Sequence, residues 1–388
     1  MRAEVILQRS FERDLEAVHL ARIRLVFATV YALLRSGRLS LTSLGRAIAR
    51  RTSPKHGIKR IDRLLGNAQL HSERVEFYRA IARRLIAPGS RPVIIVDWTA
   101  VTTHLWALVA AVSHEGRALI VYAETHGIRS YLKPYVNKAF LKRLRAVLPV
   151  CVPVVLTDAG FRSPWMKLVQ SHGWDYIGRL RGLARVRRDK REAWSDIERL
   201  WQMTGARAVD LGSFEIGQRT RFRTRVVGIR KKRRYQRRPG KPDYGPERQR
   251  RAAHEPWILA TSLDVRAAKI VKLSARRMQV EETFRDAKSH RFGICLTHAR
   301  TRSAARADLL LLLASFAQVL YVLIGLAAEA LRLQLKYQAN TMTKRRVLSL
   351  SMLGRLVLND HAGALLAPAL SGWALFSLRA TIASSFTL

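Results

Sequence analysis

The chain has 388 residues, of which 48% are apolar, so it is long enough for two or three domains and apolar enough to bury a core. A disordered basic tail is therefore excluded. Lys and Arg number 70 against 28 Asp and Glu, which gives a formal charge of +42. Because such a charge repels itself unless a polyanion neutralises it, we expect nucleic acid as the partner. A ribosomal or nucleoid-packing protein would also be basic, but those are usually shorter and carry less periodic apolar sequence.

The two cysteines and the most apolar segment bear on the compartment. Cys151 and Cys295 are far apart and form neither a disulfide framework nor a grouped zinc site, which favours a reducing cytoplasm. Residues 1–10 lack the long apolar core of a signal peptide. Residues 309–328 could span a membrane by composition, but the run is isolated and charged residues flank it. We interpret it as a buried helix and expect no membrane association.

The N-terminal region has helical periodicity. Apolar residues recur at helical spacing over 17–34, and two shorter amphipathic segments lie within 41–65. The second segment places apolar residues on one face and exposes Lys59, Arg60 and Arg63 on the other. This pattern predicts a helical DNA-binding domain over residues 1–88, although a solvated basic helix would have the same pattern.

A strand-rich pattern follows. The expected strands cover 93–97, 106–112, 118–124 and 153–157, with a helix over 136–148 before the last of them. Three strands in a meander, a helix and a further strand are the opening of the ribonuclease-H-like fold, which places metal-binding carboxylates at strand ends. Asp97 and Asp158 each close one of these apolar runs.

The pattern changes between about residues 184 and 256. Strand-like pieces cover 207–216 and 220–229, and in the run 230–251 eleven of 22 residues are Lys or Arg. We interpret this region as a β-rich basic insertion domain with a mobile loop. Helical periodicity resumes at about 267, continues to about 289 and dominates the rest of the chain.

Asp97 and Asp158 have a possible role in metal binding. Phosphodiester cleavage needs an activated oxygen nucleophile and a stabilised leaving oxygen, which a pair of divalent ions supplies. Mg²⁺ and Mn²⁺ prefer oxygen ligands, so such a site is rich in carboxylates. Either aspartate alone is more typical of a turn or a helix cap. Two of them closing apolar strands in so basic a chain favour a metal site, whose third ligand should come from a later helix.

Residues 274–288 supply the candidate for that ligand. If they form one helix, Arg277, Glu281, Arg285 and Lys288 share a face, because they are spaced by four, four and three residues. In most proteins this would be a surface salt-bridge ladder, but beside a metal site the cations would hold DNA phosphates.

At these residues the chain resembles the DDE transposases of the bacterial insertion-sequence-four family, whose signature is Tyr, two residues, Arg, three residues, Glu, six residues, Lys. Arg277, Glu281 and Lys288 keep this spacing, whereas Ser274 occupies the tyrosine position. Further similar stretches are 59–67, 96–98, 157–161, 255–261 and 281–286.

The resemblance implies an α/β protein with a ribonuclease-H-like catalytic domain interrupted by a mostly β insertion, and with helical N-terminal and C-terminal regions. Its implied segments are 1–88 (DNA binding), 89–183 (catalytic, first part), 184–256 (insertion), 257–330 (catalytic, second part) and 331–388 (dimerisation). It further implies a homodimer that synapses two ends of an insertion sequence, with double-stranded DNA as the partner, in the bacterial cytoplasm at the nucleoid.

The same resemblance implies roles for single residues. Asp97, Asp158 and Glu281 would be catalytic and hold two Mg²⁺ ions per site, with Mn²⁺ as a substitute. Arg277 and Lys288 would bind phosphate near the cut, Trp257 would stack on a flipped base, and Met278 could fill the gap that the base leaves. From its sequence alone, Trp257 is more typical of a core aromatic. The other candidates for DNA contact are Arg285, Arg179, Arg181, Lys59, Arg60 and Arg63.

Two alternatives remain at this stage. One is a catalytically impaired, DNA-binding repressor of transposition, for which the serine at position 274 leaves room. The other is a different ribonuclease-H-like nuclease such as a junction resolvase, although those are usually shorter and lack an insertion domain. The serine is too short to reach phosphate as a tyrosine would, so it predicts weaker end binding or hairpin handling without loss of metal binding.

Overall fold

The structure, a computed structural model, describes residues 3–49, 52–230, 255–289, 294, 300–361, 365–370 and 372–386. The chain forms two compact units, one of Met1–Cys151 with Met278–Leu388 and the other of Val152–Arg277. These are called unit 1 and unit 2. Both units are larger than the five segments that the sequence predicts, so those boundaries stay predictions.

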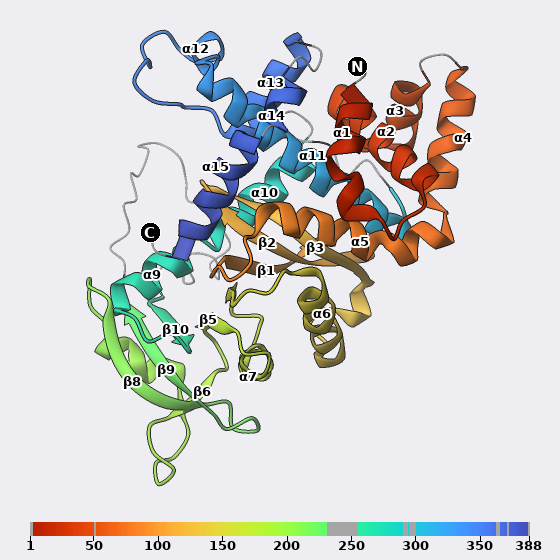
Figure 1. The fold of residues 1–388 in the computed structure, drawn as a ribbon. Helices are drawn as coiled ribbons and strands as arrows, with labels where there is room; N and C mark the ends of the chain where they lie inside the picture. Colours follow the sequence, from red (N-terminus) through yellow and green to blue (C-terminus); the bar gives the residue numbers. More distant parts are fainter. Residues whose placement is uncertain are drawn as a thin grey trace, which may run out of the picture. The chain divides into compact units, whose positions relative to one another are not determined.

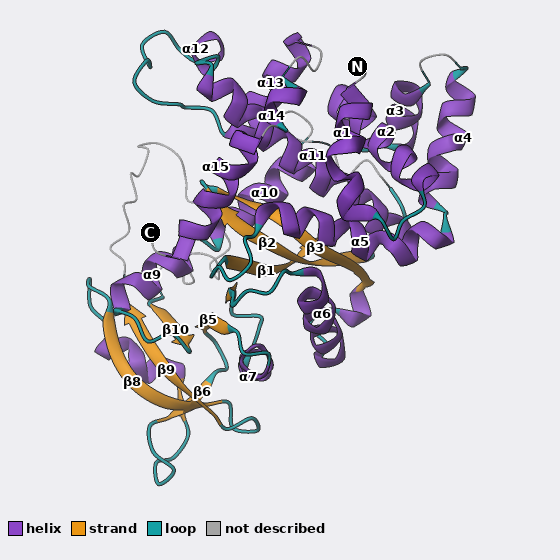
Figure 2. Cartoon of the chain, viewed as in Figure 1, coloured by secondary structure: helices purple, strands orange, loops and turns teal. Residues whose placement is uncertain are grey.

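Unit 1 combines a three-stranded antiparallel sheet with many helices (Figures 1 and 2). The strands follow the order β3-β2-β1. They are β1 (Val93–Ala100), β2 (Leu105–His114) and β3 (Arg117–Gly127). The helices are α1 (Ala3–Glu12), α2 (Leu20–Ser36), α3 (Leu41–Ile48), α4 (Pro54–Leu65), α5 (Ala68–Leu85), α6 (Pro134–Val147), α10 (Met278–Lys288), α11 (Ala304–Ala330), α12 (Gln334–Tyr337), α13 (Leu350–His361), α14 (Leu366–Ala369) and α15 (Gly372–Ala383).

Unit 2 is rich in strands, in the order β4-β5-β10-β9-β8-β6-β7. Its β4 and β5 are parallel, whereas β5, β10, β9 and β8 pair antiparallel. The elements are β4 (Val154–Thr157), α7 (Ser163–Ser171), β5 (Asp175–Leu180), β6 (Arg185–Arg187), β7 (Ser195–Asp196), β8 (Val209–Ile216), β9 (Phe222–Ile229), β10 (Trp257–Thr261) and α9 (Ala267–Ala275).

Most predicted elements are present. The meander, the helix after it and the next strand correspond to β1, β2, β3, α6 and β4, and the two strand-like pieces of the insertion correspond to β8 and β9. The basic run that follows Arg230 lies outside the described residues, and so does Cys295. Cys151 is a free thiol. Burial raises the pKa of the Cys151 thiol to about 11.

The apolar run expected as a buried helix is α11. By length and composition, α11 is the one helix of the described residues that could cross a membrane. Twenty of its 27 residues are buried in unit 1. α13 crosses it closely, because a Cβ added at Gly325 or Gly354 would lie 2.1 Å or 1.9 Å from a backbone oxygen of the other helix. The prediction of a buried core helix is confirmed.

The basic helix predicted near the N-terminus is α4. Its Ile61, Leu64 and Leu65 are buried, whereas Lys59, Arg60 and Arg63 are exposed, as the pattern predicts. α4 packs directly on α3, since a Cβ added at Gly57 would lie 2.1 Å from the carbonyl oxygen of Gly45. The three cations are therefore presented by a helix whose opposite face is fixed in a helical core.

Candidate active site and DNA-binding surface

Asp97 lies within β1, not at its end. The apolar run stops at Val96, but backbone pairing with β2 continues until Ala100 meets Trp106, so the strand extends three residues beyond Asp97. The expected position at the strand end is therefore wrong. Side chains alternate between the two faces of a strand, so Asp97 and Thr99 point to one face of the sheet and Trp98 to the other.

Helix α10 is fixed to the Asp97 face of this sheet. Lys288 donates a hydrogen bond from Nζ to Thr99 Oγ1 at 2.7 Å. Thr283 Oγ1 donates to the carbonyl oxygen of Ala118 at 2.8 Å and accepts from its N–H at 2.9 Å. These contacts, from the middle of the helix and from its last residue, hold α10 in a fixed register, and with it Glu281, two residues before Thr283.

Lys288 lies close enough to Asp97 for the two charges to interact. Burial lowers the pKa of the Lys288 ammonium, and the nearby Asp97 carboxylate opposes this by favouring the charged form. Asp97 Oδ1 also accepts a hydrogen bond from the Trp98 N–H at 2.8 Å. Unit 1 thus brings together Asp97, Lys288 and the helix that carries Glu281.

The expected single helix over 267–289 is in fact two helices. α9 ends at Ala275 and α10 begins at Met278. Between them Arg276 and Arg277 donate N–H bonds to carbonyls three residues back, at 3.0 and 3.1 Å. Arg277 is therefore outside α10, and the expectation that it shares a helical face with Glu281 is wrong. The local sequence contains no Gly or Pro that would mark this break.

Other candidates on α10 differ in their surroundings. Met278, its first residue, is 46% exposed. Arg285 is well exposed and forms a 2.8 Å ion pair with Glu282. Since an exposed ion pair of this kind contributes little to stability, Arg285 can exchange its partner for a phosphate at little cost.

Asp158 follows β4 directly, as the sequence predicts. Its Oδ1 accepts a hydrogen bond from the Gly160 N–H at 2.9 Å, which holds the turn before α7. Asp158 belongs to unit 2, whereas Asp97 and Glu281 belong to unit 1. Among the described residues, no three His, Cys, Asp or Glu side chains form a ready group of metal ligands.

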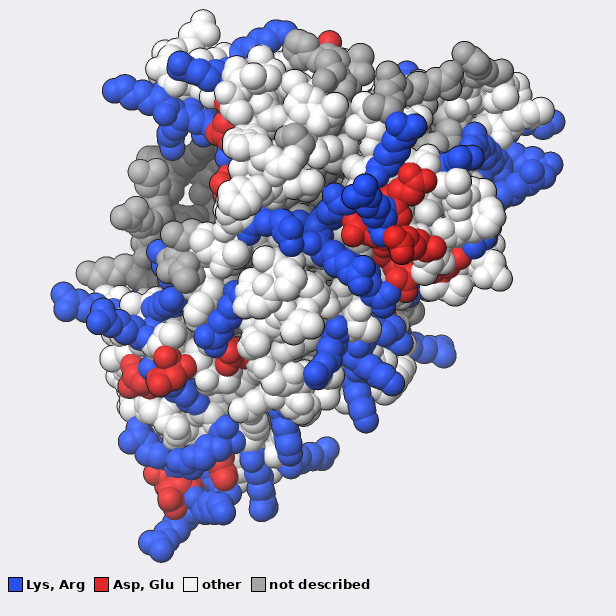
Figure 3. All heavy atoms as spheres, in the orientation of Figure 1, with Lys and Arg blue, Asp and Glu red and all other residues white. Residues whose placement is uncertain are grey.

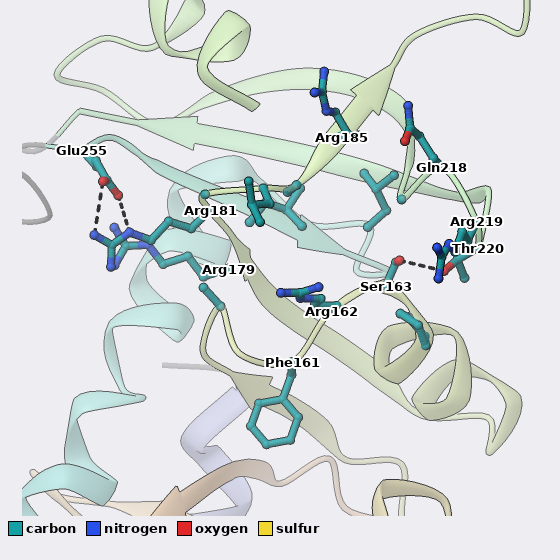
Figure 4. A pocket seen from close by; sticks show the side chains of 18 residues that line it. Phe161, Arg162, Ser163, Arg179, Arg181, Arg185, Gln218, Arg219, Thr220 and Glu255 are labelled. Atoms are coloured by element: carbon teal, nitrogen blue, oxygen red, sulfur yellow. Dashed lines mark hydrogen bonds and ion pairs between the residues drawn. The ribbon is translucent and has the colours of Figure 1, made fainter. Parts of the chain in front are cut away.

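Beside Asp158, unit 2 contains a cavity of about 920 Å³ whose lining is strongly cationic (Figure 4). Arg181 forms a two-bonded ion pair with Glu255 at one side, and Ser163 Oγ donates to Thr220 Oγ1 at 3.1 Å at the other. The cationic lining residues are Arg162, Arg179, Arg181, Arg185 and Arg219. Glu255 is the one acidic residue among the described residues of the lining, so the cavity suits an anion.

Arg179 is the least satisfied of these cations. Its Nε is buried and has no hydrogen-bond partner among the described residues. Burial lowers the pKa of the Arg179 guanidinium, and the positive charges of Arg181 and Arg277 lower it further. The negative charges of Glu255 and Asp158 act in the opposite direction and raise it. A desolvated cation without a full set of partners is costly unless an anion completes it.

Trp257 opens β10, where it pairs with Ile229, and is half-buried. The Arg179 guanidinium lies 5.8 Å from the centre of its ring. This position is compatible with either role of Trp257, as a core aromatic or as a side chain that stacks on a flipped base.

Sequence reasoning missed Arg162, Arg219 and Thr220, which line the cavity, and Thr99, which holds Lys288. These residues come from separate segments that long-range strand pairing brings together. A weak signal was present in the sequence, since Arg162 lies four residues after Asp158 and directly before α7, whose second residue is Pro164.

Comparison with known proteins places the chain in a class. Residues 88–317 match the family described as the transposase DDE domain. A comparison with curated proteins gives no match. Among solved structures the chain is similar to the piggyBac transposase in a synaptic complex with hairpin DNA, determined by cryo-EM. The two share 11% identity over 95% of this chain and 78% of that chain, with a TM-score of 0.42.

The matched residues make up more than half of the chain, and they include Asp97, Asp158 and Glu281. The chain belongs to the DDE transposase family. Its enzymatic class is accordingly DNA transposition, which in this family generally depends on divalent metal ions.

Proposed function

We propose that the protein is a cut-and-paste transposase of the insertion-sequence-four group, which binds the terminal inverted repeats of an insertion sequence and excises it through a hairpin. The observation that carries the proposal is the Lys288–Thr99 hydrogen bond. It holds α10, the helix that carries Glu281 and Lys288, on the face of β1 where Asp97 lies.

Asp97 and Glu281 of unit 1, with Asp158 of unit 2, are the proposed ligands for two Mg²⁺ ions, with Mn²⁺ as a substitute. All three are carboxylates, so the donor chemistry fits a hard divalent ion, and phosphate oxygens of bound DNA would complete its coordination. When bound, such ions activate the attacking oxygen and stabilise the leaving oxygen.

The chain's own residues position the DNA. Lys288 and Arg277 would neutralise phosphates near the cut, and Arg285 and the cavity residues Arg179 and Arg181 would bind other phosphates of the DNA. Trp257 would stack on a flipped base, and Met278 would fill its place in the duplex. Lys59, Arg60 and Arg63 on α4 would bind the terminal repeat.

The proposed order of reaction has four steps. Water hydrolyses the phosphodiester at the end of the element, the released 3′-OH attacks the opposite strand to form a hairpin, the hairpin is opened, and the 3′-OH joins target DNA. A homodimer would synapse the two ends through residues 331–388, with the bacterial nucleoid as its place of action.

The test uses purified protein, Mg²⁺ and a labelled plasmid carrying the element with its native flanks. Hairpins and joined products support the proposal. Nicks without hairpins identify a different nuclease, and binding without cleavage identifies a repressor.

Variants then assign the residues. Asp97→Asn, Asp158→Asn and Glu281→Gln should each abolish cleavage while preserving binding of the end. Glu282→Gln is the matched control, because it removes a neighbouring carboxylate of the same helix and should leave cleavage intact. A carboxylate variant that still cut DNA would be removed from the ligand set.

A further inference from the structure

The surface around α6 in unit 1 is strongly basic. From Glu124 to Asp158 the sequence contains no Asp or Glu between the two, but six Lys and Arg, all of them exposed. Five of these six lie on or just before α6, where Figure 3 shows Lys and Arg side chains gathered. Arg143 pairs with Glu124, and residues 125–157 contain no acid to offset the other five cations.

Large apolar side chains are exposed among these cations. Ile128 is 55% exposed, Tyr131 38% and Tyr135 66%. Single exposed apolar residues are ordinary, but three within eight residues form a contiguous feature that needs a reason. We call the group Ile128, Arg129, Tyr131, Lys133, Tyr135 and Lys138 the α6 patch.

The α6 patch has a rigid base. Arg143 of α6 pairs through two hydrogen bonds with Glu124 of β3, which is buried, and Phe140 packs on Tyr122 at 5.4 Å. Burial alone would raise the pKa of Glu124, but hydrogen bonds from His126, Arg143 and Tyr122 outweigh it and lower the pKa to about 2. The carboxylate is therefore charged and holds α6 to the sheet at any physiological pH.

The patch is also joined to the strand that carries Asp97. The Tyr131 ring lies 5.4 Å from that of Trp98 and 4.8 Å from that of Trp106. Trp98 is the residue after Asp97 but points to the opposite face of the sheet from α10. The α6 patch is thus close to the strand that carries Asp97, on the opposite face of the unit 1 sheet from α10.

We propose that the α6 patch binds the duplex into which the excised element is joined, the target DNA. This rests on the proposed function, because an enzyme that joins one DNA to another must hold two duplexes, and the residues already assigned account for the first. Arg129, Lys133 and Lys138 neutralise backbone phosphates of the target. Between these phosphates, Ile128 and Tyr135 contact the groove of the target DNA, where an apolar side chain can wedge against a base step.

The experiment uses the full-length protein and measures two properties of each variant. The first is metal-free binding of a random-sequence duplex over a salt series. The second is the yield of cleavage and of strand transfer from a pre-cut end into a supercoiled plasmid. The charge variant is Arg129→Gln with Lys133→Gln and Lys138→Gln, and the apolar variant is Ile128→Ser with Tyr135→Ser.

For the charge variant we expect the slope of log K against log salt to become shallower by about 2 to 3, since each lost phosphate contact contributes about 0.9. Strand transfer should fall about tenfold or more while end cleavage stays within about twofold, because only the second duplex is affected. The apolar variant should reduce strand transfer with an unchanged salt slope, because it removes no charge.

The matched control removes three exposed cations of unit 2 to which no role is assigned, Lys190→Gln, Arg266→Gln and Lys272→Gln. An equal loss of binding in this control would overturn the proposal, since net charge alone would explain it. The proposal would also be overturned if the charge variant lost cleavage as much as strand transfer. Unchanged duplex binding in the charge variant would overturn it too, and would favour an acidic protein as the occupant of the patch. If the wild type proved unable to cut DNA, the proposed function would fail, but the metal-free binding measurement would still decide whether the patch holds a duplex.

Discussion

Lys288 reaches across from α10 to Thr99, two residues past Asp97 on the same face of β1, and donates a 2.7 Å hydrogen bond to its hydroxyl. The acceptor is neutral, so the ammonium keeps its full charge for a phosphate or for the Asp97 carboxylate. Thr99 therefore positions a cation without neutralising it.

Thr99→Val should reduce end cleavage by about tenfold, because it removes an acceptor of a charged group and leaves Lys288 free to rotate. Lys288→Met should reduce both cleavage and end binding, since the charge itself is lost. The matched control is Thr125→Val. Thr125 lies on β3, on the same face of the sheet as Thr99, and its hydroxyl has no hydrogen-bond partner among the described residues. Single-turnover cleavage of a labelled end duplex measures the effect, and equal rates for Thr99→Val and Thr125→Val would contradict it.

Arg179→Met should weaken end binding yet raise the melting temperature. The guanidinium lines the cationic cavity with an unpartnered Nε, so replacing it with an apolar chain relieves a desolvated charge in the absence of DNA. Arg181→Met is the control, because Arg181 is paired with Glu255 and its loss leaves that carboxylate uncompensated. Thermal unfolding without DNA compares the two, and a lower melting temperature for Arg179→Met would show that its charge is already satisfied.

Ser274→Tyr should restore the family signature. Ser274 lies in the last turn of α9, half-buried, and a tyrosine there extends far enough for its hydroxyl to bond a phosphate. A bond to a charged group of this kind corresponds to about a tenfold gain in end binding or hairpin yield. Ser274→Phe adds the ring without the hydroxyl, so equal results for the two variants would assign the effect to packing. Unchanged binding and hairpin yield in Ser274→Tyr would refute the inference altogether.

Unit 1 should lose stability on mild acidification through His114. Burial lowers the pKa of this imidazole to about 4, and the charge of Arg346 adds to it. Between about pH 6.5 and 4 the unfolded state binds the proton and the folded state does not, so stability rises with pH in this window. The expected loss is about 2 kcal/mol between pH 6.5 and 5. Urea unfolding at both pH values measures it, and His114→Phe should show a smaller difference than the wild type.

Local pattern predicts much of this fold because β-runs, amphipathic faces and turns are local properties. It identified β4 with Asp158 after it, the exposed cations of α4 and the buried character of α11. It placed Asp97 at a strand end because hydrophobicity stops at Val96, whereas the strand continues by backbone pairing, which has no hydrophobic signature. It likewise missed the break at Arg276–Arg277, where no helix-breaking residue occurs, and the cavity, whose cations meet only through long-range pairing.

The edge strand β3 shows a further property of the way α10 and α11 are attached. Its outward backbone groups are taken up by side chains: Thr283 bonds both polar groups of Ala118, Gln318 bonds the same carbonyl at 3.0 Å, and Asp308 accepts from the Thr125 N–H at 2.6 Å. An open edge is a template on which another chain can add a strand. With the groups of Ala118 and Thr125 occupied, β3 does not offer a continuous row of open backbone groups, so a strand of a second chain could not pair along its whole length.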